Sequence, residues 1–246
     1  MSVAPPGWPR YADAMVNPTR LSSDLARLQH ETDSYLATVD SLSEQQLLEP
    51  SLCGSWDRAH VVAHLASNAR AIAKLVDWAV TGERQQPYTS RELRDAEIDE
   101  LAALPREQLL RRSADNAAHF ARQCERLAGP LRVTDLDLHG KPITAAAIPS
   151  VRVAELVMHH DDLDTSWTLA DADPQSVLDT LEGAVRTMRA KGAPGMTLRT
   201  TEHDEWVVGD GGQLVTGDRV ALLGWLARGR TEGVRSEGAL PELPAW

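Results

Sequence analysis

The sequence predicts an α+β protein in which a bundle of four long helices precedes a small domain of helices and short strands. Apolar residues recur at helical spacing in long segments as far as residue 166. After Trp167 the pattern changes to short strand-like runs that glycines separate. We therefore expect a helical domain over residues 1–166 and an α+β domain over residues 167–246, a division that suits a chain of 246 residues.

The first helix is predicted to begin at Asn17 and to end near Ser43. Asn17 is a good capping residue, and Pro18 fits the first helical turn because an N–H there would have no partner within the helix. Prolines at positions 5, 6 and 9 indicate an extended lead over residues 1–16. The expected inward positions of this helix are Leu21, Leu25, Leu28 and Tyr35.

Three further helical segments are expected before residue 166. The second helix follows Ser55, its expected N-cap, and ends at Gly82, its expected C-cap glycine. A third helical region covers about residues 90–128, where Pro105 divides it because proline interrupts helical hydrogen bonding. Residues 129–148 are rich in glycine and proline and are predicted to be irregular. The fourth long helix runs from about residue 149 to about residue 165.

The C-terminal domain is predicted to open with a helix from Asp173-Pro174 to Lys191, closed by Gly192. Strand-like runs follow at residues 196–201, 205–208, 213–215 and 234–236, with another helix over about residues 218–227. The glycine-rich segment at residues 209–212 is expected to be a hairpin turn.

The charge of the chain argues against two classes of partner. With 25 Lys and Arg against 36 Asp and Glu, the formal net charge is −11, whereas binding to nucleic acid or to an anionic membrane needs a basic surface. The N-terminus lacks the pattern of a signal peptide, and no run of about 18 apolar residues is present. We expect a cytoplasmic monomer that binds neither nucleic acid nor membrane.

The two cysteines, Cys53 and Cys124, do not suggest a disulfide framework. Neither belongs to a CxxC motif, and both are predicted to be free thiols in a reducing compartment. Because neither has a nearby histidine or lysine pattern that would activate a thiolate, we expect both thiols to be unreactive.

Two helical segments offer candidate metal ligands. Glu155 and His159 are four residues apart and share one helical face, and His60 and His64 form a similar pair in the second helix. A histidine from one helix and the Glu/His pair of the other would give three N/O ligands with an open position, which is typical of a catalytic zinc site. On spacing alone, a solvated contact between Glu155 and His159 is the favoured alternative, because such pairs are common on helices.

An acidic run, His160-Asp161-Asp162 with Asp164, follows the candidate ligands. Its carboxylates could accept hydrogen bonds from the ligand imidazoles and orient them. A solvated helix end is the favoured alternative, because runs of charge usually face water.

A second cluster, Arg228-Gly229-Arg230, ends the last predicted helix. Two guanidinium groups could hold a dicarboxylate by bidentate contacts. The favoured alternative is ordinary, since basic residues complement the negative end of a helix.

Four motifs together resemble the mycothiol-dependent maleylpyruvate isomerase family, whose main domain is a DinB-like metal-binding four-helix bundle. They are GSWDRAHVVAHLASNA at residues 54–69, WAVTGE at 78–83, ELVMHHDDL at 155–163 and LLGWLARGR at 222–230. The resemblance covers nearly the whole chain, including the small C-terminal domain.

This resemblance implies that His64, Glu155 and His159 bind a divalent metal, with zinc as the expected ion. His64 is preferred to His60 because it matches the family's second histidine, and His159 is preferred to His160 because it completes the four-residue step from Glu155.

The family also uses a C-terminal arginine near the active site. Because the step from Trp225 differs by one residue from the commonest family pattern, Arg228 and Arg230 are both candidates, with a slight preference for Arg230. Helical phase adds His60, Asn68 and Asp162 as candidates to contact the thiol.

The implied activity is the cis–trans isomerisation of maleylpyruvate, a dicarboxylate, to fumarylpyruvate with mycothiol as cosubstrate. The thiolate would add to the carbon–carbon double bond, the resulting single bond would rotate, and the thiol would be eliminated. An alternative is a mycothiol S-transferase of the same fold, which would consume the thiol. A non-catalytic binding protein is a third hypothesis, disfavoured because all three candidate ligands are present.

Overall fold

The protein is described by a computed structural model over residues 16–138 and 140–245, so the predicted extended lead lies, apart from Val16, outside the described residues. Within these ranges the chain forms α-helices, a two-stranded sheet and a four-stranded sheet. The α+β class predicted from the sequence is confirmed. No helix among the described residues is long and apolar enough to cross a membrane.

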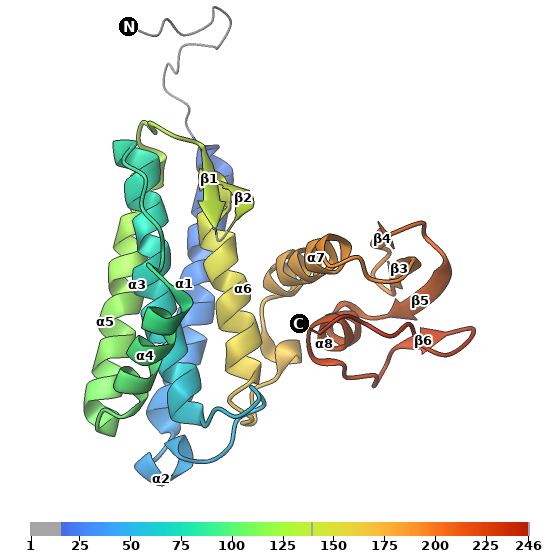
Figure 1. Cartoon of the computed structure of the whole chain (residues 1–246), viewed down its shortest axis with the longest axis horizontal. Coiled ribbons are helices and arrows are strands. Elements are labelled where there is room, and N and C mark those ends of the chain that lie inside the picture. Colours follow the sequence, from blue (N-terminus) through green and yellow to red (C-terminus); the bar gives the residue numbers. More distant parts are fainter. Residues whose placement is uncertain (1–15, 139, 246) are drawn as a thin grey trace, which may run out of the picture. The chain divides into compact units, whose positions relative to one another are not determined.

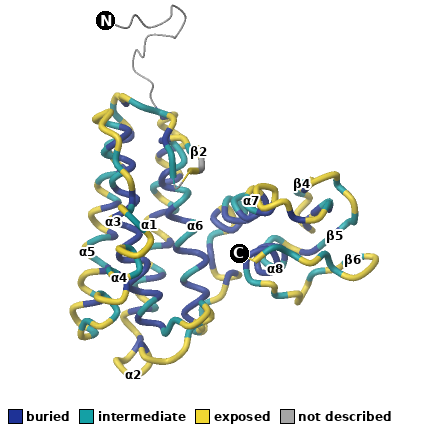
Figure 2. Tube along the Cα trace, viewed as in Figure 1, coloured by how far each residue is buried: buried dark blue, intermediate teal, exposed yellow. Residues whose placement is uncertain are grey.

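The predicted long helices are all present (Figure 1). They are α1 (Pro18–Ser41), α3 (Arg58–Thr81), α5 (Arg106–Glu125) and α6 (Ile148–Asp161). A single turn, α2 (Glu44–Leu47), follows α1, and α4 (Arg91–Ala102) precedes α5 across Pro105, where the sequence predicts the division. Helix α3 is buried along most of its length (Figure 2), as its nearly continuous apolar sequence requires.

The chain divides into two compact units, each built from two segments. Among the described residues, one unit contains those up to residue 26 and those between residues 62 and 149, and the other contains residues 27–61 and those from residue 150 onward. The domain boundary expected between residues 166 and 167 stays a prediction.

The first unit contains a β-hairpin where an irregular segment was predicted, and that prediction is wrong. Strands β1 (Asp135–Leu138) and β2 (Lys141–Thr144) pair antiparallel, with Leu136 opposite Ile143. Gly140 adopts a φ of 79°, and its N–H donates to Asp137 Oδ1 at 3.0 Å. Strands of four residues are too short to show a clear alternation, and Pro142 weakens the strand signal further.

The predicted start of α3 at Ser55 is also wrong, because the helix begins at Arg58. Asp57 is the capping residue, since its Oδ1 accepts from the His60 N–H at 2.9 Å. Residues 51–56 form a turn in which the Trp56 N–H donates to the Cys53 carbonyl, and Pro50 bridges Asp57. The turn delays the helix by a few residues, whereas the end of α3 at Gly82, with a φ of 81°, is as predicted.

Helix α6 ends at Asp161, about four residues earlier than expected. Asp164 has a positive φ of 51°, which no helix accommodates. The carbonyls of Leu163 and Asp164 accept hydrogen bonds from Arg58 rather than from a following helical turn. Because α6 ends early, the residues between Asp161 and Trp167 lie outside the helix.

The four-stranded sheet of the second unit has the order β4-β3-β5-β6. The strands are β3 (Met196–Thr200), β4 (Glu205–Val208), β5 (Gln213–Gly217) and β6 (Arg235–Ser236). Strand β3 pairs antiparallel with β4 and parallel with β5. Helices α7 (Pro174–Ala190) and α8 (Arg219–Arg228) pack against each other and against this sheet (Figure 1).

This strand order corrects the prediction of a hairpin turn at residues 209–212. Strands β4 and β5 lie on opposite sides of β3, so the glycine-rich segment crosses from one edge of β3 to the other. Gly209 has a φ of 59°, and a Cβ there would lie 3.1 Å from the Gly195 Cα. The glycines therefore permit a close crossing of the backbone.

Candidate functional site

Glu155 and His159 face each other on adjacent turns of α6. His159 Nε2 lies 3.8 Å from Glu155 Oε2, and the two side chains are 16% and 33% exposed. One nitrogen and one carboxylate oxygen are thus offered together from one face of the helix, as their spacing predicts.

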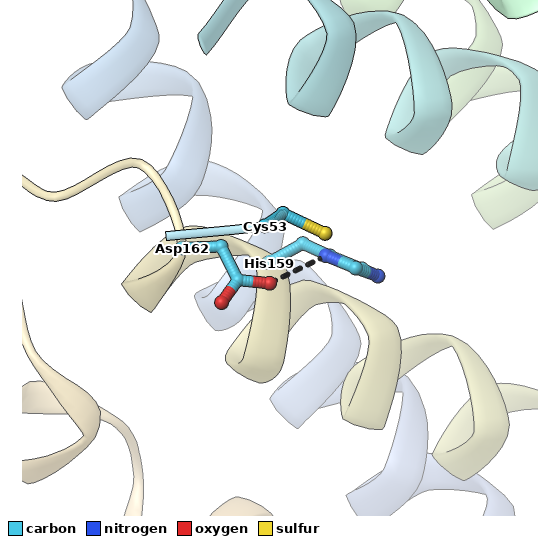
Figure 3. A group of neighbouring side chains, drawn as sticks. All are labelled: Cys53, His159 and Asp162. Carbon is cyan, nitrogen blue, oxygen red and sulfur yellow. Dashed lines mark hydrogen bonds and ion pairs between the residues drawn. The ribbon is translucent and has the colours of Figure 1, made fainter. Parts of the chain in front are cut away.

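The second ring nitrogen of His159 is held by Asp162 (Figure 3). His159 Nδ1 lies 2.8 Å from Asp162 Oδ2, and the Asp162 side chain is 0% exposed. Because an ionised carboxylate only accepts hydrogen bonds, Nδ1 is the protonated nitrogen and Nε2 is directed to Glu155. This is the orientation in which a carboxylate fixes the tautomer of a metal-binding histidine.

The favoured prediction of a solvated acidic helix end is wrong, because Asp161 and Asp162 are both buried. Each is paired with an arginine from the end of α8. Arg228 Nε donates to Asp162 Oδ1 at 2.8 Å and Arg228 Nη2 donates to Asp162 Oδ2 at 2.7 Å. Arg230 pairs with Asp161, whose Oδ1 also accepts from the Leu169 N–H at 3.2 Å.

Both arginines therefore do more than complement a helix dipole, the role that the sequence favoured for them. Gly229 between them has a φ of 69° and ends α8 in the left-handed conformation, which glycine adopts without strain. Arg228 and Arg230 differ in exposure, at 14% and 38% of the side chain.

The ionisation of the cluster follows from these contacts. Burial opposes protonation of His159, but its contacts with Asp162, Cys53 and Glu155 outweigh burial and raise its pKa to about 9. Burial opposes ionisation of Asp162, but hydrogen bonds from Arg228 and His159 prevail and lower its pKa to about 2. Arg228 has a raised pKa, because its pairing with Asp162 outweighs the opposing effect of burial. Both Asp162 and Arg228 are therefore charged at neutral pH.

Cys53 lies beside this pair, although its sequence neighbourhood offers no pattern that would activate a thiolate (Figure 3). Candidate ligand atoms of Cys53, His159 and Asp162 all lie within 4.8 Å of one another. The Leu52 N–H donates to the Asp162 carbonyl at 2.9 Å and anchors the Cys53 turn to the end of α6. Cys53 and His159 are distant in sequence, so no local motif could have revealed this contact.

The histidines of α3 have defined partners too. His60 Nδ1 lies 2.6 Å from Asp57 Oδ1, and its ring stacks on Trp56 with the centroids 6.4 Å apart. His64 is buried, and Arg94 Nη2 of α4 lies 3.2 Å from its Nδ1, a contact that the sequence did not suggest. Asn68, one turn beyond His64, is buried as well.

His160, the neighbour of His159, belongs to a separate packed cluster. Its ring stacks on Trp167 with centroids 3.7 Å apart and an interplanar angle of 9°, and its Nε2 lies 2.7 Å from Thr38 Oγ1. Burial of the ring lowers the pKa of His160 to about 3. His160 thus has packing partners of its own, and the preference for His159 as a ligand stays a prediction.

The neutral His160 predicts a loss of stability in mild acid. The folded-state pKa of about 3 lies below the ordinary value of 6.5, so the unfolded chain binds a proton that the folded chain excludes. The free energy of unfolding should fall by about 2 kcal/mol between pH 6.5 and pH 4.5 through this residue. Urea unfolding at both pH values should show a smaller decrease for His160→Gln than for the wild type.

His30→Gln is the matched control, because it removes an exposed histidine of α1. This variant should keep the wild-type dependence of stability on pH. An equal decrease in the wild type and His160→Gln would contradict the assignment of a neutral buried His160.

Arg58 is a structural residue that the sequence did not single out. Its Nη2 donates to the Asp164 carbonyl at 2.8 Å, its Nε to the Leu163 carbonyl, and its Nη1 to the Gln46 carbonyl at 3.2 Å and to Glu49. Arg58 thereby joins the start of α3 to the residues that follow α6, next to Asp162.

Comparison with known proteins identifies the family. A model of the mycothiol maleylpyruvate isomerase N-terminal domain matches residues 28–164, which is more than half of the chain. Crystal structures of the mycothiol-dependent maleylpyruvate isomerase and of a histidine-to-alanine mutant of it are similar to this structure, each with a TM-score of 0.83. They are 26% and 25% identical to this chain, and each comparison covers 92% of this chain and 97% of the other. No curated protein sequence matches. The chain belongs to the mycothiol maleylpyruvate isomerase family.

Proposed function

We propose that this protein is a zinc-dependent isomerase that converts maleylpyruvate to fumarylpyruvate with mycothiol as its thiol cosubstrate. The observation that carries the proposal is the orientation of His159. Its Nδ1 is held by Asp162 at 2.8 Å while its Nε2 is directed to Glu155, 3.8 Å away. Family membership gives this arrangement its chemical meaning.

The donors of α6 fit a zinc ion. An imidazole nitrogen and a carboxylate oxygen on one helical face, with the second ring nitrogen bonded to a buried carboxylate, match the chemistry of zinc ligands. The family resemblance adds His64 of α3 as the third ligand. A bound zinc ion would supply a Lewis acid that lowers the pKa of a thiol at the open position.

Arg230 is our candidate for binding the substrate carboxylate and the negative charge that develops during the reaction. Its side chain is 38% exposed, against 14% for Arg228. A guanidinium group suits both tasks because it offers paired donors in a plane. In a chain of net charge −11, this arginine gives a dicarboxylate a local positive site.

We propose that His60 and Asn68 of α3 contact the thiol cosubstrate. His60 is 30% exposed and its Nδ1 is bonded to Asp57, which fixes its ring. Asp162 was a third candidate, but its carboxylate oxygens are bonded to His159 and Arg228, and we propose no thiol contact for it.

Turnover of maleylpyruvate by the zinc-loaded full-length chain, with and without mycothiol, tests the function. Thiol-dependent loss of the substrate's ultraviolet absorbance, with fumarylpyruvate formed and the thiol recovered, is the expected result. Stoichiometric loss of the thiol would establish the S-transferase alternative instead. No turnover by protein that binds zinc would overturn the isomerase assignment.

A further inference from the structure

Asp162 is a fully buried carboxylate that joins residues from two distant segments of the chain. On one side its Oδ2 accepts from His159 Nδ1 at 2.8 Å, from the preceding helical turn. On the other side both of its oxygens accept from Arg228, at 2.8 Å and 2.7 Å. A carboxylate with three charge-assisted hydrogen bonds and no exposure to water has little freedom to rotate.

Arg228 is fully engaged by these contacts. Its Nε and Nη2 donate to Asp162, and its Nη1 donates to the Ala227 carbonyl at 2.9 Å. If a substrate carboxylate drew Arg228 away, Asp162 would remain buried without its cationic partner. Breaking a buried ion pair in this way is strongly unfavourable, because it leaves an uncompensated charge away from water.

Arg230 is placed differently. It is more exposed than Arg228, and its partner Asp161 also accepts from the Leu169 N–H at 3.2 Å. Asp161 therefore keeps a hydrogen bond when Arg230 moves to a ligand. The two arginines are separated only by Gly229, but they differ in how easily each can leave its carboxylate partner.

We infer that Asp162 and Arg228 are positioning residues, which together hold His159 in the orientation that binds metal, and that Arg230 alone binds the substrate. The inference rests on the proposed function, because it takes His159 as a zinc ligand. It divides the roles of two arginines that the sequence could not separate. It also makes zinc affinity depend on a side chain that itself binds no metal.

Zinc affinity of the metal-stripped, full-length chain, measured by chelator competition with Zn²⁺ alone, tests this division. Asp162→Asn and Arg228→Met should each raise the zinc dissociation constant by about tenfold to a hundredfold, the usual effect of losing a partner behind a metal ligand. Arg230→Met should leave that constant unchanged and should raise KM for the substrate. Unchanged or tighter zinc binding by both Asp162→Asn and Arg228→Met would overturn the inference.

Arg219→Met provides the matched control for losing a bidentate arginine–aspartate pair. Arg219 Nε and Nη2 donate to Asp204 at 2.6 Å and 2.9 Å, in the same unit as Arg228, but Asp204 has no contact with a candidate ligand among the described residues. This variant should bind zinc as the wild type does. Asp161→Asn is the corresponding control for Asp162→Asn, since Asp161 pairs with Arg230 and accepts from the Leu169 N–H instead of contacting a candidate ligand.

The imidazole signals of His159 in long-range ¹H–¹⁵N spectra give a second readout that a general loss of stability would not produce. In the metal-free wild type the Nδ1 proton should show a strong hydrogen bond, and Asp162→Asn should shift it. Arg228→Lys, which keeps the charge, should retain more of the wild-type signal than Arg228→Met. If Arg228→Met or Asp162→Asn fails to fold, the zinc affinity of Arg228→Lys still tests the inference.

The two hypotheses fail in different ways. Absence of zinc binding by the wild type would refute the proposed metal site and the inference built on it. Normal zinc binding by the wild type, with equal affinity in Asp162→Asn, Arg228→Met and Arg219→Met, would refute the inference and leave the proposed function standing.

Discussion

Glu155→Gln should lower thiol-dependent isomerisation by about a thousandfold, measured as kcat/KM for maleylpyruvate at a saturating concentration of mycothiol. The substitution keeps the size of the side chain but removes the negative charge that lies 3.8 Å from His159 Nε2. A loss of about 4 kcal/mol in transition-state stabilisation corresponds to this factor and is what removal of Lewis-acid assistance costs. The zinc content of the purified variant should fall together with its activity.

Glu182→Gln is the control for this experiment. Glu182 lies on α7 and forms an exposed ion pair with Arg186, four residues further along the helix. It has the same residue type and helical spacing but lies away from the candidate ligands in the sequence. Its kcat/KM and zinc content should match the wild type. Full activity of Glu155→Gln with normal zinc content would contradict the role of Glu155 as a ligand.

Arg58→Met should lower the free energy of unfolding by about 3 kcal/mol. The variant keeps an apolar stem but leaves the carbonyls of Leu163 and Asp164 without their arginine donor. A buried acceptor without a partner, here the Leu163 carbonyl, costs about 1–3 kcal/mol, and the almost fully buried Arg58 also loses its other hydrogen bonds. A chain of this size should show a decrease of about 6–12 °C in Tm.

Arg58→Lys should recover part of this loss, since a lysine ammonium can replace some of the donors but cannot reproduce the planar fork of a guanidinium. Arg111→Met removes an exposed arginine paired with Glu107 on α5 and should change stability by less than about 0.5 kcal/mol. Equal stability of Arg58→Met and Arg111→Met would show that the contacts of Arg58 contribute little.

Local signals placed most of the helix ends correctly. Asn17 with Pro18, Gly82, and Asp173 with Pro174 mark ends of α1, α3 and α7 where the sequence predicts them. These signals act over a few residues, so they can be read without knowledge of the rest of the fold. Ser55 failed as a cap because the bridge between Pro50 and Asp57 holds the preceding chain in a turn.

The sequence by itself determined the α+β class, the helical spacing of Glu155 and His159, and the presence of paired arginines at the end of α8. Only the tertiary structure decided that Asp162 is buried, that Arg228 neutralises it, and that Cys53 lies beside His159. A run of charges in a sequence is normally solvated, since burying one costs several kcal/mol without a partner. Here the partner of Asp162 comes from 66 positions further along the chain, and a local pattern cannot reveal an interaction of that length.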